Sequence, residues 1–566
     1  MIKRSFIICL LFIAVSCLKD KEKRQPEAKK DFLFTEMPSD STGIDFINMV
    51  ENEKDFNIFN YRNFYNGGGV GVGDLNNDGL PDVYFTANRK KNKLYLNKGN
   101  FKFQDISASA GVEGSRSWST GVTMVDINAD GYLDIYVCNA GNLQGDDKKN
   151  ELFVNNGDLT FTERAAQYNL DDSGFGTHAA FFDYDGDGDL DAYILNNSFI
   201  PVSSLGYVNK RELRSEDWDI PEVLKGGGDK LMRNDNGKFT DVSEEAGIYG
   251  SLIGFGLGVT VGDINGDFLP DIYVSNDFYE RDYLYINQGD GSFKEEIKDY
   301  MQHVSLSSMG ADMADLNNDG YPEIFVTDML PEDDKRLKET GDYERYDLFQ
   351  LKKSRDFYNQ YMQNTLQLNN GDGTFSEIAH FSDVAKTDWS WGALMFDMDN
   401  DGYRDIFVSN GIFHDLTNND FMDFFANDII QKMSITGKKE EIEKVINKMP
   451  STPIPNYAFK NNKDMVFENM NEEWGLDHPG FSNGSAYADL DNDGDLDLLV
   501  NNFNMPAFIY KNNSEKKGRN FIKLRVKGAG QNSMAIGSII DIHSNGEVIR
   551  QELIPTRGFQ SSVDYI

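Results

Sequence analysis

The chain has 566 residues, of which 93 are Asp or Glu and 55 are Lys or Arg, so its formal net charge is −38. This length allows a large buried core and more than one domain. The strong negative charge argues against binding to nucleic acid or to an anionic membrane surface, and it favours divalent cations or a solvated acidic surface. The 52 Gly, 40 Phe and 26 Tyr residues favour a β-rich chain of short strands and tight turns.

The N-terminus predicts export. Two basic residues precede the apolar run SFIICLLFIAVS, which is followed by Cys17 and a charged stretch. A run this short indicates the core of a signal peptide, not a membrane-spanning helix. Residues 14–17 (AVSC) resemble a bacterial lipobox. This resemblance implies a lipoprotein signal peptide at 1–17, a lipid on Cys17, a charged tether at 18–31 and anchoring to the outer membrane, facing the cell surface or the periplasm. The alternative is an ordinary cleaved signal with Cys17 nearby by chance.

Cysteine usage agrees with an exported chain that is held together by something other than disulfides. Cys9 would leave with the signal peptide and Cys17 would carry lipid, so only Cys138 would remain as a thiol. No internal disulfide is then possible, and bound metal is the obvious alternative source of structural cross-links.

One unit repeats along the rest of the chain. An Asp-rich stretch occurs seven times, at 74–82, 126–134, 183–191, 263–271, 315–323, 397–405 and 489–497. A strand of small residues precedes each copy, and a strand such as DIYVCNA follows it. Two further strand patterns, as in NELFVNNG and LTFTER, complete most units. Four short antiparallel strands per unit predict an all-β fold, a seven-bladed β-propeller. A stacked β-solenoid is the alternative, but its strands would be parallel and its period about half as long.

Each Asp-rich stretch has the chemistry of a calcium loop. Oxygen ligands occupy positions 1, 3, 5 and 9, and Gly at position 6 allows the chain to turn around an ion. Ca²⁺ accepts six to eight oxygens in a flexible shell, whereas Mg²⁺ demands a stricter octahedron, so we expect several Ca²⁺ ions, up to seven. The predicted ligands are Asp74, Asn76, Asp78, Asp82, Asp126, Asn128, Asp130, Asp134, Asp183, Asp185, Asp187, Asp191, Asp263, Asn265, Asp267, Asp271, Asp315, Asn317, Asp319, Glu323, Asp397, Asp399, Asp401, Asp405, Asp489, Asp491, Asp493 and Asp497.

Other interpretations of these loops are weaker. An EF-hand needs Glu at position 12 and a following helix, but position 12 is Phe, Val or Ile within a strand pattern in every copy. Asx-rich turns that bind nothing remain an alternative. Two copies depart from the pattern: Phe268 replaces Gly at position 6, and Glu323 replaces Asp at position 9. Because a bulky residue at positive φ costs roughly 1 kcal/mol or more, we expect weaker or altered metal binding at 263–271.

The repeats resemble a known family. NGGGVGVGDLNNDG, NTLQLNNGDGTFSEI and TDWSWGALMFDMDNDGYRDIFVSNG are similar to the FG-GAP/VCBS repeats of the integrin α-subunit propeller, which implies Ca²⁺ in the loops. The whole arrangement is similar to bacterial VCBS-repeat proteins and the cartilage acidic protein group. The final LRVKGAGQNSMAIGSIIDIHSNGEVIRQELIPTRGFQSS resembles an ASPIC/UnbV domain. The resemblance implies a propeller at 32–515, followed at 516–566 by the start of a β-rich ASPIC/UnbV-like domain, which we expect to be truncated.

The order of the strands predicts two faces and a closure. PAFIYKNN (506–513) has the pattern of a third strand, and we expect it to close the ring in the first blade beside DFLFTEM (31–37). The alternative is a lead into the next domain. All seven calcium loops fall on one face, while three long insertions, at about 197–228, 328–363 and 411–455, fall on the other. The last insertion has helical periodicity. We expect the insertions to form a binding site, or alternatively to cap the channel.

The sequence contains no recognisable catalytic motif, and we assign no catalytic residue. None of the six His residues forms an HExxH motif, and GxSxG, Walker and zinc-Cys patterns are absent from the sequence. Trp389 and Trp391 fit inter-blade packing better than a sugar platform. The preferred prediction is therefore a lipid-anchored, calcium-stabilised binding or adhesion module for a glycan or protein. The alternative is a polysaccharide lyase-like enzyme, for which the insertion residues His414, Asp415, Arg345 and Arg355 are the first candidates.

Overall fold

The computed structural model describes residues 31–141, 148–341, 345–426, 442–544 and 546–566. The signal peptide, Cys17, the tether up to residue 30 and part of the third insertion therefore lie outside the described residues. Leu33–Ile566 form one compact unit. The predicted domain boundaries stay predictions.

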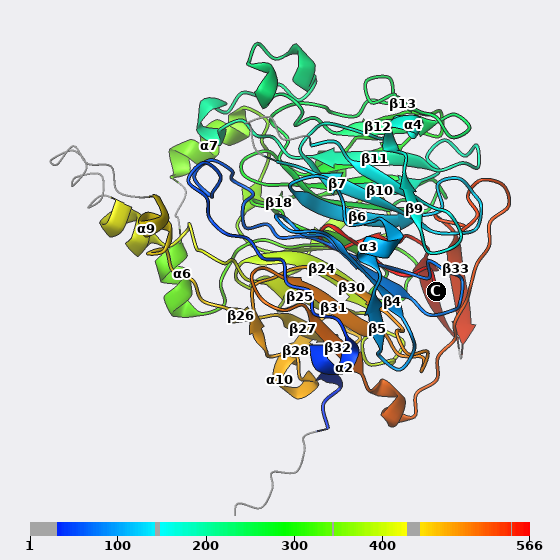
Figure 1. Cartoon of the computed structure of the whole chain (residues 1–566). Coiled ribbons are helices and arrows are strands. Elements are labelled where there is room, and N and C mark those ends of the chain that lie inside the picture. The colour runs from blue at the N-terminus through cyan, green and yellow to red at the C-terminus, as the bar shows by residue number, and fades with distance from the viewer. Residues whose placement is uncertain (1–30, 142–147, 342–344, 427–441, 545) are drawn as a thin grey trace, which may run out of the picture. The chain divides into compact units, whose positions relative to one another are not determined.

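Seven blades of four antiparallel strands follow one another around a ring, which confirms the predicted seven-bladed propeller (Figure 1). Six of these sheets have four strands, and a C-terminal hairpin extends the sheet of blade 1 to six. Blades 1 to 3 are β2 (Val70–Gly73), β3 (Asp82–Phe85), β4 (Lys93–Asn97) and β5 (Phe103–Asp105); β6 (Ser119–Val125), β7 (Asp134–Asn139), β8 (Glu151–Asn155) and β9 (Phe161–Glu163); and β10 (Gly176–Phe182), β11 (Asp191–Asn196), β12 (Lys230–Asn234) and β13 (Phe239–Asp241). Blades 4 to 6 are β14 (Gly256–Gly262), β15 (Asp271–Asn276), β16 (Tyr283–Asn287) and β17 (Phe293–Glu295); β19 (Ala311–Ala314), β20 (Glu323–Val326), β22 (Thr365–Asn369) and β23 (Phe375–Glu377); and β24 (Ser390–Phe396), β25 (Asp405–Asn410), β27 (Tyr457–Asn461) and β28 (Phe467–Asn469).

Blade 7 closes the ring with a strand from the other end of the chain. It contains β30 (Ser482–Ala488), β31 (Asp497–Asn502) and β32 (Phe508–Asn512), and its outer strand is β1 (Phe34–Glu36). β1 pairs antiparallel with β32, so the predicted pairing of the two stretches is correct. The predicted blade is wrong. Blade 1 already has four strands of its own, whereas blade 7 lacks an outer strand until β1 supplies it.

The innermost strand of each blade is rich in small residues because neighbouring backbones converge at the ring axis. A Cβ atom on Gly69 would lie 1.7 Å from the carbonyl oxygen of Gln560, and one on Gly484 would lie 2.6 Å from that of Gly68. Larger residues fill the wider gaps between blades. For example, Phe396 of blade 6 stacks on Tyr487 of blade 7 with ring centroids 4.4 Å apart, a contact type that adds to the stabilisation from apolar burial.

Short helices lie in the connections between the strands of the propeller. One-turn helices follow the outer strands of four blades, at α3 (Ser107–Ala110), α4 (Ala165–Tyr168), α5 (Ile297–Tyr300) and α10 (Asn471–Trp474), and α2 (Ser39–Thr42) follows β1. The three insertions join the second and third strands of their blades, as predicted. They contain η1 (Val202–Ser204), η2 (Ser215–Asp217) and η3 (Glu222–Leu224); α6 (Asp334–Thr340) and α7 (Tyr346–Ser354); and the π-helix η4 (Phe421–Ala426) and α9 (Ile442–Ile446). Two-stranded pairs β18 (Val304–Ser305) with β21 (Gln360–Tyr361), and β26 (Ile454–Pro455) with β29 (Pro479–Gly480), brace them.

The propeller therefore has two distinct faces. We call the one with the Asp-rich loops the loop face, and the one with the three insertions the insertion face. In Figure 1, α6, α7 and α9 lie on the left, and β33 (Ile539–Ser544) and the C-terminus lie on the right. On the insertion side the axis is covered by an aromatic cluster that includes Phe56, Tyr61, Phe64 and Trp118.

The C-terminal segment (residues 519–566) packs on the loop face. After η5 (Ser514–Lys517) it forms the hairpin of β33 and β34 (Glu547–Glu552). A second hairpin, β35 (Thr556–Arg557) and β36 (Ser561–Ser562), enters the axis, where Ser562 pairs in parallel register with Gly71 of β2. At its turn Phe559 is fully buried and lies 5.3 Å from Trp391, measured between ring centroids. The propeller centre is thus filled from both faces.

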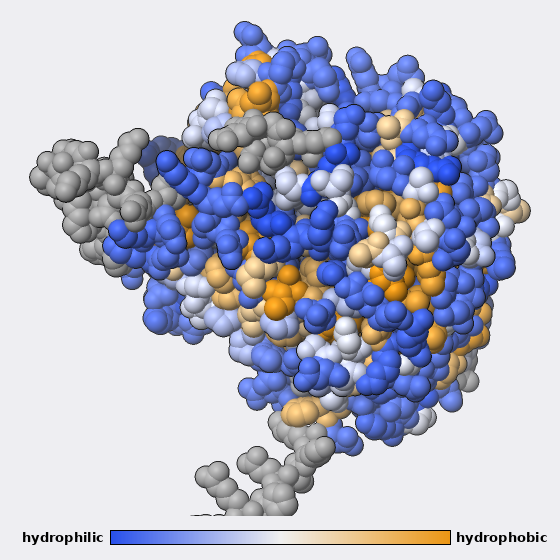
Figure 2. Space-filling view, viewed as in Figure 1, coloured by the Kyte–Doolittle hydropathy of each residue, from blue (hydrophilic) through white to orange (hydrophobic). Residues whose placement is uncertain are grey.

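The surface agrees with the composition. Figure 2 shows a mostly hydrophilic face with scattered apolar side chains, as expected for a chain of high net charge.

Among the described residues, no helix has the length and apolarity that crossing a membrane requires. Cys138 is a buried free thiol within β7.

Candidate functional site

The seven Asp-rich loops share two hydrogen bonds: the position 1 carboxylate accepts from the backbone N–H of position 6, and the position 9 carboxylate accepts from that of position 2. Taking the loop at 126–134, the Oδ1 of Asp126 accepts from the backbone N–H of Asp130 (3.1 Å) and its Oδ2 accepts from that of Gly131 (2.9 Å). At the other end of the loop, Asp134 accepts from the backbone N–H groups of Ile127 (3.0 Å) and Asn155 (2.7 Å). The first and last carboxylates thus wrap the loop around a common centre, and their remaining lone pairs can still bind a cation.

Backbone conformation explains why the seven loops have the same shape. Position 6 has positive φ in every copy, and Gly occupies it in six of the seven. In the seventh, Phe268 adopts φ of 67° with its side chain 74% exposed, and its N–H still donates to Asp263 (3.0 Å). The substitution therefore does not alter the path of this loop. Whether metal binding at 263–271 is weaker, as predicted, stays a prediction.

Three loops bring together carboxylates from different positions of the pattern. Within each group the potential ligand oxygens lie within 4.8 Å of one another. The groups are Asp183, Asp185 and Asp191; Asp397, Asp399 and Asp405; and Asp489, Asp491 and Asp493. In the other four loops position 3 is Asn, whose side-chain amide donates to the position 5 carboxylate, as from Asn76 to Asp78 (2.9 Å).

Burial makes the carboxyl groups at position 9 costly to ionise. Burial raises the pKa of Asp82, Asp191 and Asp271 to about 8 and that of Asp134 to about 7. A buried carboxylate is costly unless a cation or hydrogen-bond donors compensate its charge. Glu323, the longer residue at this position, leaves its buried Oε1 without a hydrogen-bond partner. An all-oxygen donor set of carboxylates and amides fits a hard cation such as Ca²⁺.

A set of Asn residues joins the loops to their neighbours. In six blades, the Asn that ends the third strand donates its side-chain amide to the position 2 carbonyl of the preceding blade's loop. Asn155 of blade 2 reaches Leu75 of blade 1 in this way (2.8 Å). The equivalent residues are Asn97, Asn287, Asn369, Asn461 and Asn512. The strand pattern NELFVNNG contains this Asn, but nothing in the sequence indicated that its side chain links adjacent blades.

The C-terminal segment contacts all seven loops. Three of its basic residues bind acidic loop residues: Arg519 lies 2.8 Å from Asp399, Lys523 2.7 Å from Asp489 and Arg525 3.1 Å from Asp74. The other four loops are contacted by Ser533, Asn532, Glu552 and Arg550. Protein cations therefore offset part of the loop charge. No sequence pattern marked this role, because the basic residues of the segment have no regular spacing.

The four residues proposed for an enzymatic alternative do not converge. His414 is buried against Tyr65 (5.6 Å between ring centroids), and burial lowers its pKa. Asp415 forms an ion pair with Arg336. Arg345 is exposed and binds Asp347 (2.5 Å), while Arg355 donates to backbone carbonyls at 206 and 207. Each of the four side chains therefore contacts another part of the fold, and the four share no common site.

The two tryptophans differ in environment. Trp391 is buried, donates its indole N–H to the carbonyl of Gly411 at the end of β25 in its own blade (2.8 Å) and lies against Phe559 of the C-terminal segment, so its role in packing between blades stays a prediction. Trp389 is half-buried and lines a cavity of about 220 Å³ together with Arg336, Asp388 and Asp415. The ion pairs of Arg336 with Asp388 and Asp415 fill the polar side of this cavity.

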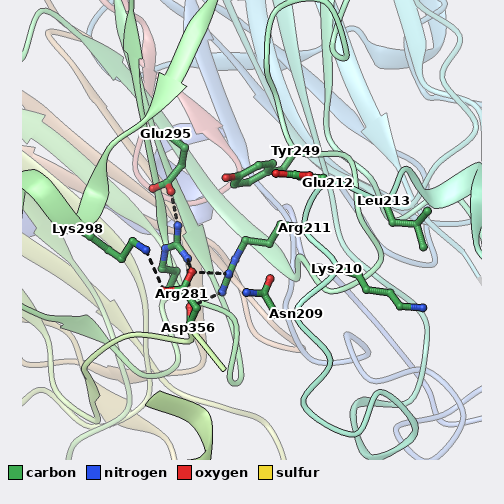
Figure 3. Close-up of a pocket in the computed structure, with 10 residues that line it drawn as sticks. All are labelled: Asn209, Lys210, Arg211, Glu212, Leu213, Tyr249, Arg281, Glu295, Lys298 and Asp356. Carbon is green, nitrogen blue, oxygen red and sulfur yellow. Dashed lines mark hydrogen bonds and ion pairs between the residues drawn. The ribbon is translucent and has the colours of Figure 1, made fainter. Parts of the chain in front are cut away.

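A larger depression of about 690 Å³ opens on the insertion face (Figure 3). Residues 209–213 of the first insertion form one wall, and Tyr249, Arg281, Glu295 and Lys298 of blade 4 and its connections form the floor and the other wall. Asp356 of the second insertion enters from below in Figure 3. Two insertions distant in sequence thus meet one blade here.

An ion-pair network fixes five of the charged side chains of this depression. Arg211 pairs with the fully buried Glu280 and lies 3.3 Å from Asp356. Arg281 pairs with Glu295 and also contacts Asp356 (3.4 Å), and Lys298 lies 2.9 Å from the same carboxylate. The carboxylate of Asp356 therefore contacts three basic side chains, and the Asp356 side chain remains 48% exposed. The result is a polar wall whose side chains are already ordered.

Comparisons with known proteins agree with the repeat architecture. Residues 65–137, 140–194, 263–326 and 347–408 match the family described as FG-GAP-like repeat, and residues 528–566 match that described as ASPIC and UnbV. Six Asp-rich loops lie inside the matched stretches. The loop at 489–497 lies outside them, although the structure has a complete blade there.

The chain is also similar to curated relatives. Cartilage acidic protein 1 of Xenopus tropicalis is 29% identical over 217 residues, which cover 38% of this chain and 29% of the relative. The mouse (Mus musculus) protein is 27% identical over 210 residues, covering 37% and 29% of the two chains, and the human (Homo sapiens) protein is 27% identical over 213 residues, covering 38% and 28%. The match spans less than one third of the length of these relatives.

Two solved structures match this chain at low similarity. One describes recognition of non-reducing terminal N-acetylglucosamine by an Agrocybe aegerita lectin; it is 14% identical, with a TM-score of 0.35, over 74% of this chain and 87% of that chain. The other is the V. cholerae biofilm matrix protein Bap1, which is 11% identical, with a TM-score of 0.36, over 92% and 99% of the two chains.

Proposed function

We propose that this chain, which carries FG-GAP-like repeats and a C-terminal ASPIC/UnbV region, is a calcium-stabilised binding or adhesion module for a glycan or protein. In this proposal the loop face holds Ca²⁺ and maintains the ring, while the insertion face recognises the ligand. The lipid on Cys17 holds the module at the cell surface.

The depression of Figure 3 is the observation that carries the proposal. It is open and polar, and five of its charged side chains are held by ion pairs in the absence of a ligand, namely Arg211, Arg281, Glu295, Lys298 and Asp356. Asn209, Glu212 and Tyr249 add amide, carboxylate and hydroxyl groups to its lining. Such a mixture of fixed donors and acceptors suits a hydroxyl-rich ligand such as a glycan, because the binding site loses little conformational entropy.

The same lining argues against catalysis at this place. The described residues that line the depression include no Ser, Cys or His. Burial raises the pKa of Tyr249, which disfavours a phenolate that would act as a base. Arg211 and Arg281 are each committed to a buried carboxylate. A binding surface therefore accounts for these residues better than an acid–base site does.

The loops support the calcium part of the proposal through their donor set. The first, third, fifth and ninth positions supply carboxylate or amide oxygens, and in three loops the carboxylates from three of these positions converge within 4.8 Å. Ca²⁺ bound there would offset the repulsion between these carboxylates and link the first two strands of each blade.

The ligand proposal is tested by a glycan array screened with the purified chain in excess Ca²⁺, followed by measured dissociation constants for the best glycan. We expect the Lys210→Ala/Tyr249→Phe variant to bind at least about tenfold more weakly, the equivalent of about 1.4 kcal/mol. The control Lys238→Ala removes an exposed cation outside the depression, in the turn between the third and fourth strands of blade 3, and should bind like the wild type.

Two outcomes would contradict the proposal. Equal binding by the double variant would place the ligand elsewhere. Unsaturated products, absorbing near 235 nm after incubation with polysaccharides, would favour the lyase-like alternative.

Anchoring is tested separately: Cys17→Ser should move the protein from the membrane fraction to the soluble exported fraction, and retention in the membrane would contradict the lipid anchor.

A further inference from the structure

Three carboxylates gather where the propeller ends and the C-terminal segment begins. Asp493 and Asp495 are positions 5 and 7 of the loop at 489–497, and Glu515 lies in η5 directly after blade 7. Their potential ligand oxygens all lie within 4.8 Å of one another. Neither Asp495 nor Glu515 belongs to the set of positions 1, 3, 5 and 9 that defines the repeated loops.

Asp495 is the residue that points to a bound ligand. Its side chain is fully buried (0% exposed), and its Oδ2 accepts from the hydroxyl of Ser514 (3.0 Å) and the backbone N–H of Glu515 (3.0 Å). Its Oδ1 is also buried and has no hydrogen-bond partner. A buried carboxylate oxygen without a donor is costly, so the fold leaves at this atom a place that a cation would fill.

Three of the nearby basic side chains are committed to other groups. Lys511 pairs with Asp491 and Asp493 (2.8 Å to the latter), Lys523 binds Asp489 (2.7 Å), and Lys516 donates to the side chain of Asn513 (2.7 Å). Within the described part of the chain, no ion pair reaches Asp495 or Glu515. The protein therefore brings these two acids together without supplying their counter-charge.

We propose that Asp493, Asp495 and Glu515 bind a hard divalent cation, Ca²⁺ in the first place, in a site additional to the seven repeated loops. The donors are all carboxylate oxygens, which favour Ca²⁺, Mg²⁺ or Mn²⁺ over Zn²⁺ or Cu²⁺. Asp493 would serve both this site and its own loop. The inference does not depend on a ligand at the insertion face.

The loop at 183–191 provides an internal comparison. It also has Asp at position 7, and Asp189 is buried (3% exposed) with an unpartnered Oδ1. In that blade, however, the residue at the place of Glu515, three positions after the Asn that ends the third strand, is Gly237. No third carboxylate joins Asp189 there, and the site is specific to blade 7.

An ion at this junction would fix the start of the C-terminal segment. Ser514 also accepts from the side chain of Asn400 in the preceding loop (3.1 Å), and Arg519, four residues after Glu515, binds Asp399. The cation would therefore hold η5 against blades 6 and 7, at the point from which the chain goes on to contact the other loops.

The test counts bound Ca²⁺ per full chain by mass spectrometry of the metal after gel filtration, and follows backbone hydrogen exchange at 513–519 with Ca²⁺ or EGTA. We expect Glu515→Gln and Asp495→Asn to bind one ion fewer than the wild type, or to hold one ion at least about tenfold more weakly. Ca²⁺ should slow exchange at 513–519 in the wild type but not in Glu515→Gln.

Two controls make the result specific. Glu472→Gln removes an exposed acid on α10 and should keep the wild-type count, as should Asp189→Asn, which lacks the third carboxylate. A wild-type count and unchanged exchange in Glu515→Gln would overturn the site. So would an equal loss in Asp189→Asn, because any position 7 acid would then strengthen its own loop. If the repeated loops bind no Ca²⁺, the wild type would carry this one ion alone, so failure of the two proposals is distinguishable.

Discussion

The two faces of this propeller are built on opposite principles. On the loop face one nine-residue connection is repeated seven times, with the same hydrogen bonds and the same positive φ at position 6. On the insertion face three insertions of different length and sequence follow the same strand without a shared motif. Repetition suits a scaffold, because every blade boundary must be stabilised in the same way, whereas a specific ligand requires irregular surfaces.

The ends of the chain reinforce this contrast. The segment before blade 1 covers the axis on the insertion side with apolar aromatic rings, while the C-terminal segment covers the loop side with basic and polar side chains. The N-terminal segment contributes the burial of apolar surface, and the C-terminal segment offsets the negative charge of the Asp-rich loops. We expect ionic conditions to affect the loop face strongly and the insertion face weakly.

The largest expected effect is a pH dependence that changes sign with calcium. Burial raises the pKa of Asp82, Asp191 and Asp271 to about 8, above the value of about 4 for an unfolded Asp. The folded state then binds protons more tightly, so its stability falls as pH rises from about 4 to about 8. In EGTA the melting temperature should fall over this range. In excess Ca²⁺ it should rise, because the ion binds the carboxylate form. Parallel curves in scanning calorimetry would contradict this.

Phe559→Ala tests the plug of the C-terminal segment in the axis. Its ring is fully buried against Trp391, and truncation should lower the free energy of unfolding by about 3–5 kcal/mol. The control Phe381→Ala removes a ring that is 68% exposed and should change it by less than about 0.5 kcal/mol. Urea denaturation measures both. A loss below about 1 kcal/mol for Phe559→Ala would mean that the hairpin is not part of the core.

Asn155→Ala tests the links between blades on the loop face. The side chain donates to the carbonyls of Leu75 (2.8 Å) and Leu133 (3.1 Å), which would lose their partner in a buried position. We expect a loss of about 1–3 kcal/mol in the free energy of unfolding. The exposed neighbour Asn156, changed to Ala, should lose little. Equal losses in the two variants would argue against an inter-blade role for the Asn set.

The smallest effects concern position 6 of the loops. Gly79→Ala meets no atom within 4 Å, so its expected cost of about 1 kcal/mol comes from positive φ alone. Phe268→Gly relieves the same strain but frees the unfolded chain, so a net gain of about 0.5 kcal/mol or less is expected. Chemical denaturation of both variants in Ca²⁺ should give changes of opposite sign, and two changes of the same sign would contradict the strain argument.

The repeated parts of the molecule could be predicted from the sequence because their signal is local. The positions of Asp74, Asp78, Gly79 and Asp82 define the loop, and the flanking strand patterns define the blade. The pairing of 31–37 with 506–513 was also predictable, since each stretch carries a strand pattern without its own unit. Its assignment to blade 1 was wrong because the FTE of β1 has the pattern of an outer strand, which blade 1 already has in β5.

The non-repeated parts could not be predicted, for a physical reason. Arg519, Lys523 and Arg525 reach three different loops because the segment crosses the loop face, and its path depends on tertiary packing, not on spacing. The depression of Figure 3 likewise joins Arg211 and Asp356, which are 145 positions apart in the chain. No periodic signal connects such residues before the ring is closed.

The central claim is that the loop face is a calcium-stabilised scaffold, and a thermal melt tests it most directly. The full chain is heated at pH 7.5 or so, in excess Ca²⁺ and in EGTA, with circular dichroism as the readout. We predict a midpoint lower by at least about 5 °C in EGTA, because each bound ion stabilises the folded state by mass action. An unchanged midpoint would contradict structural calcium in the loops.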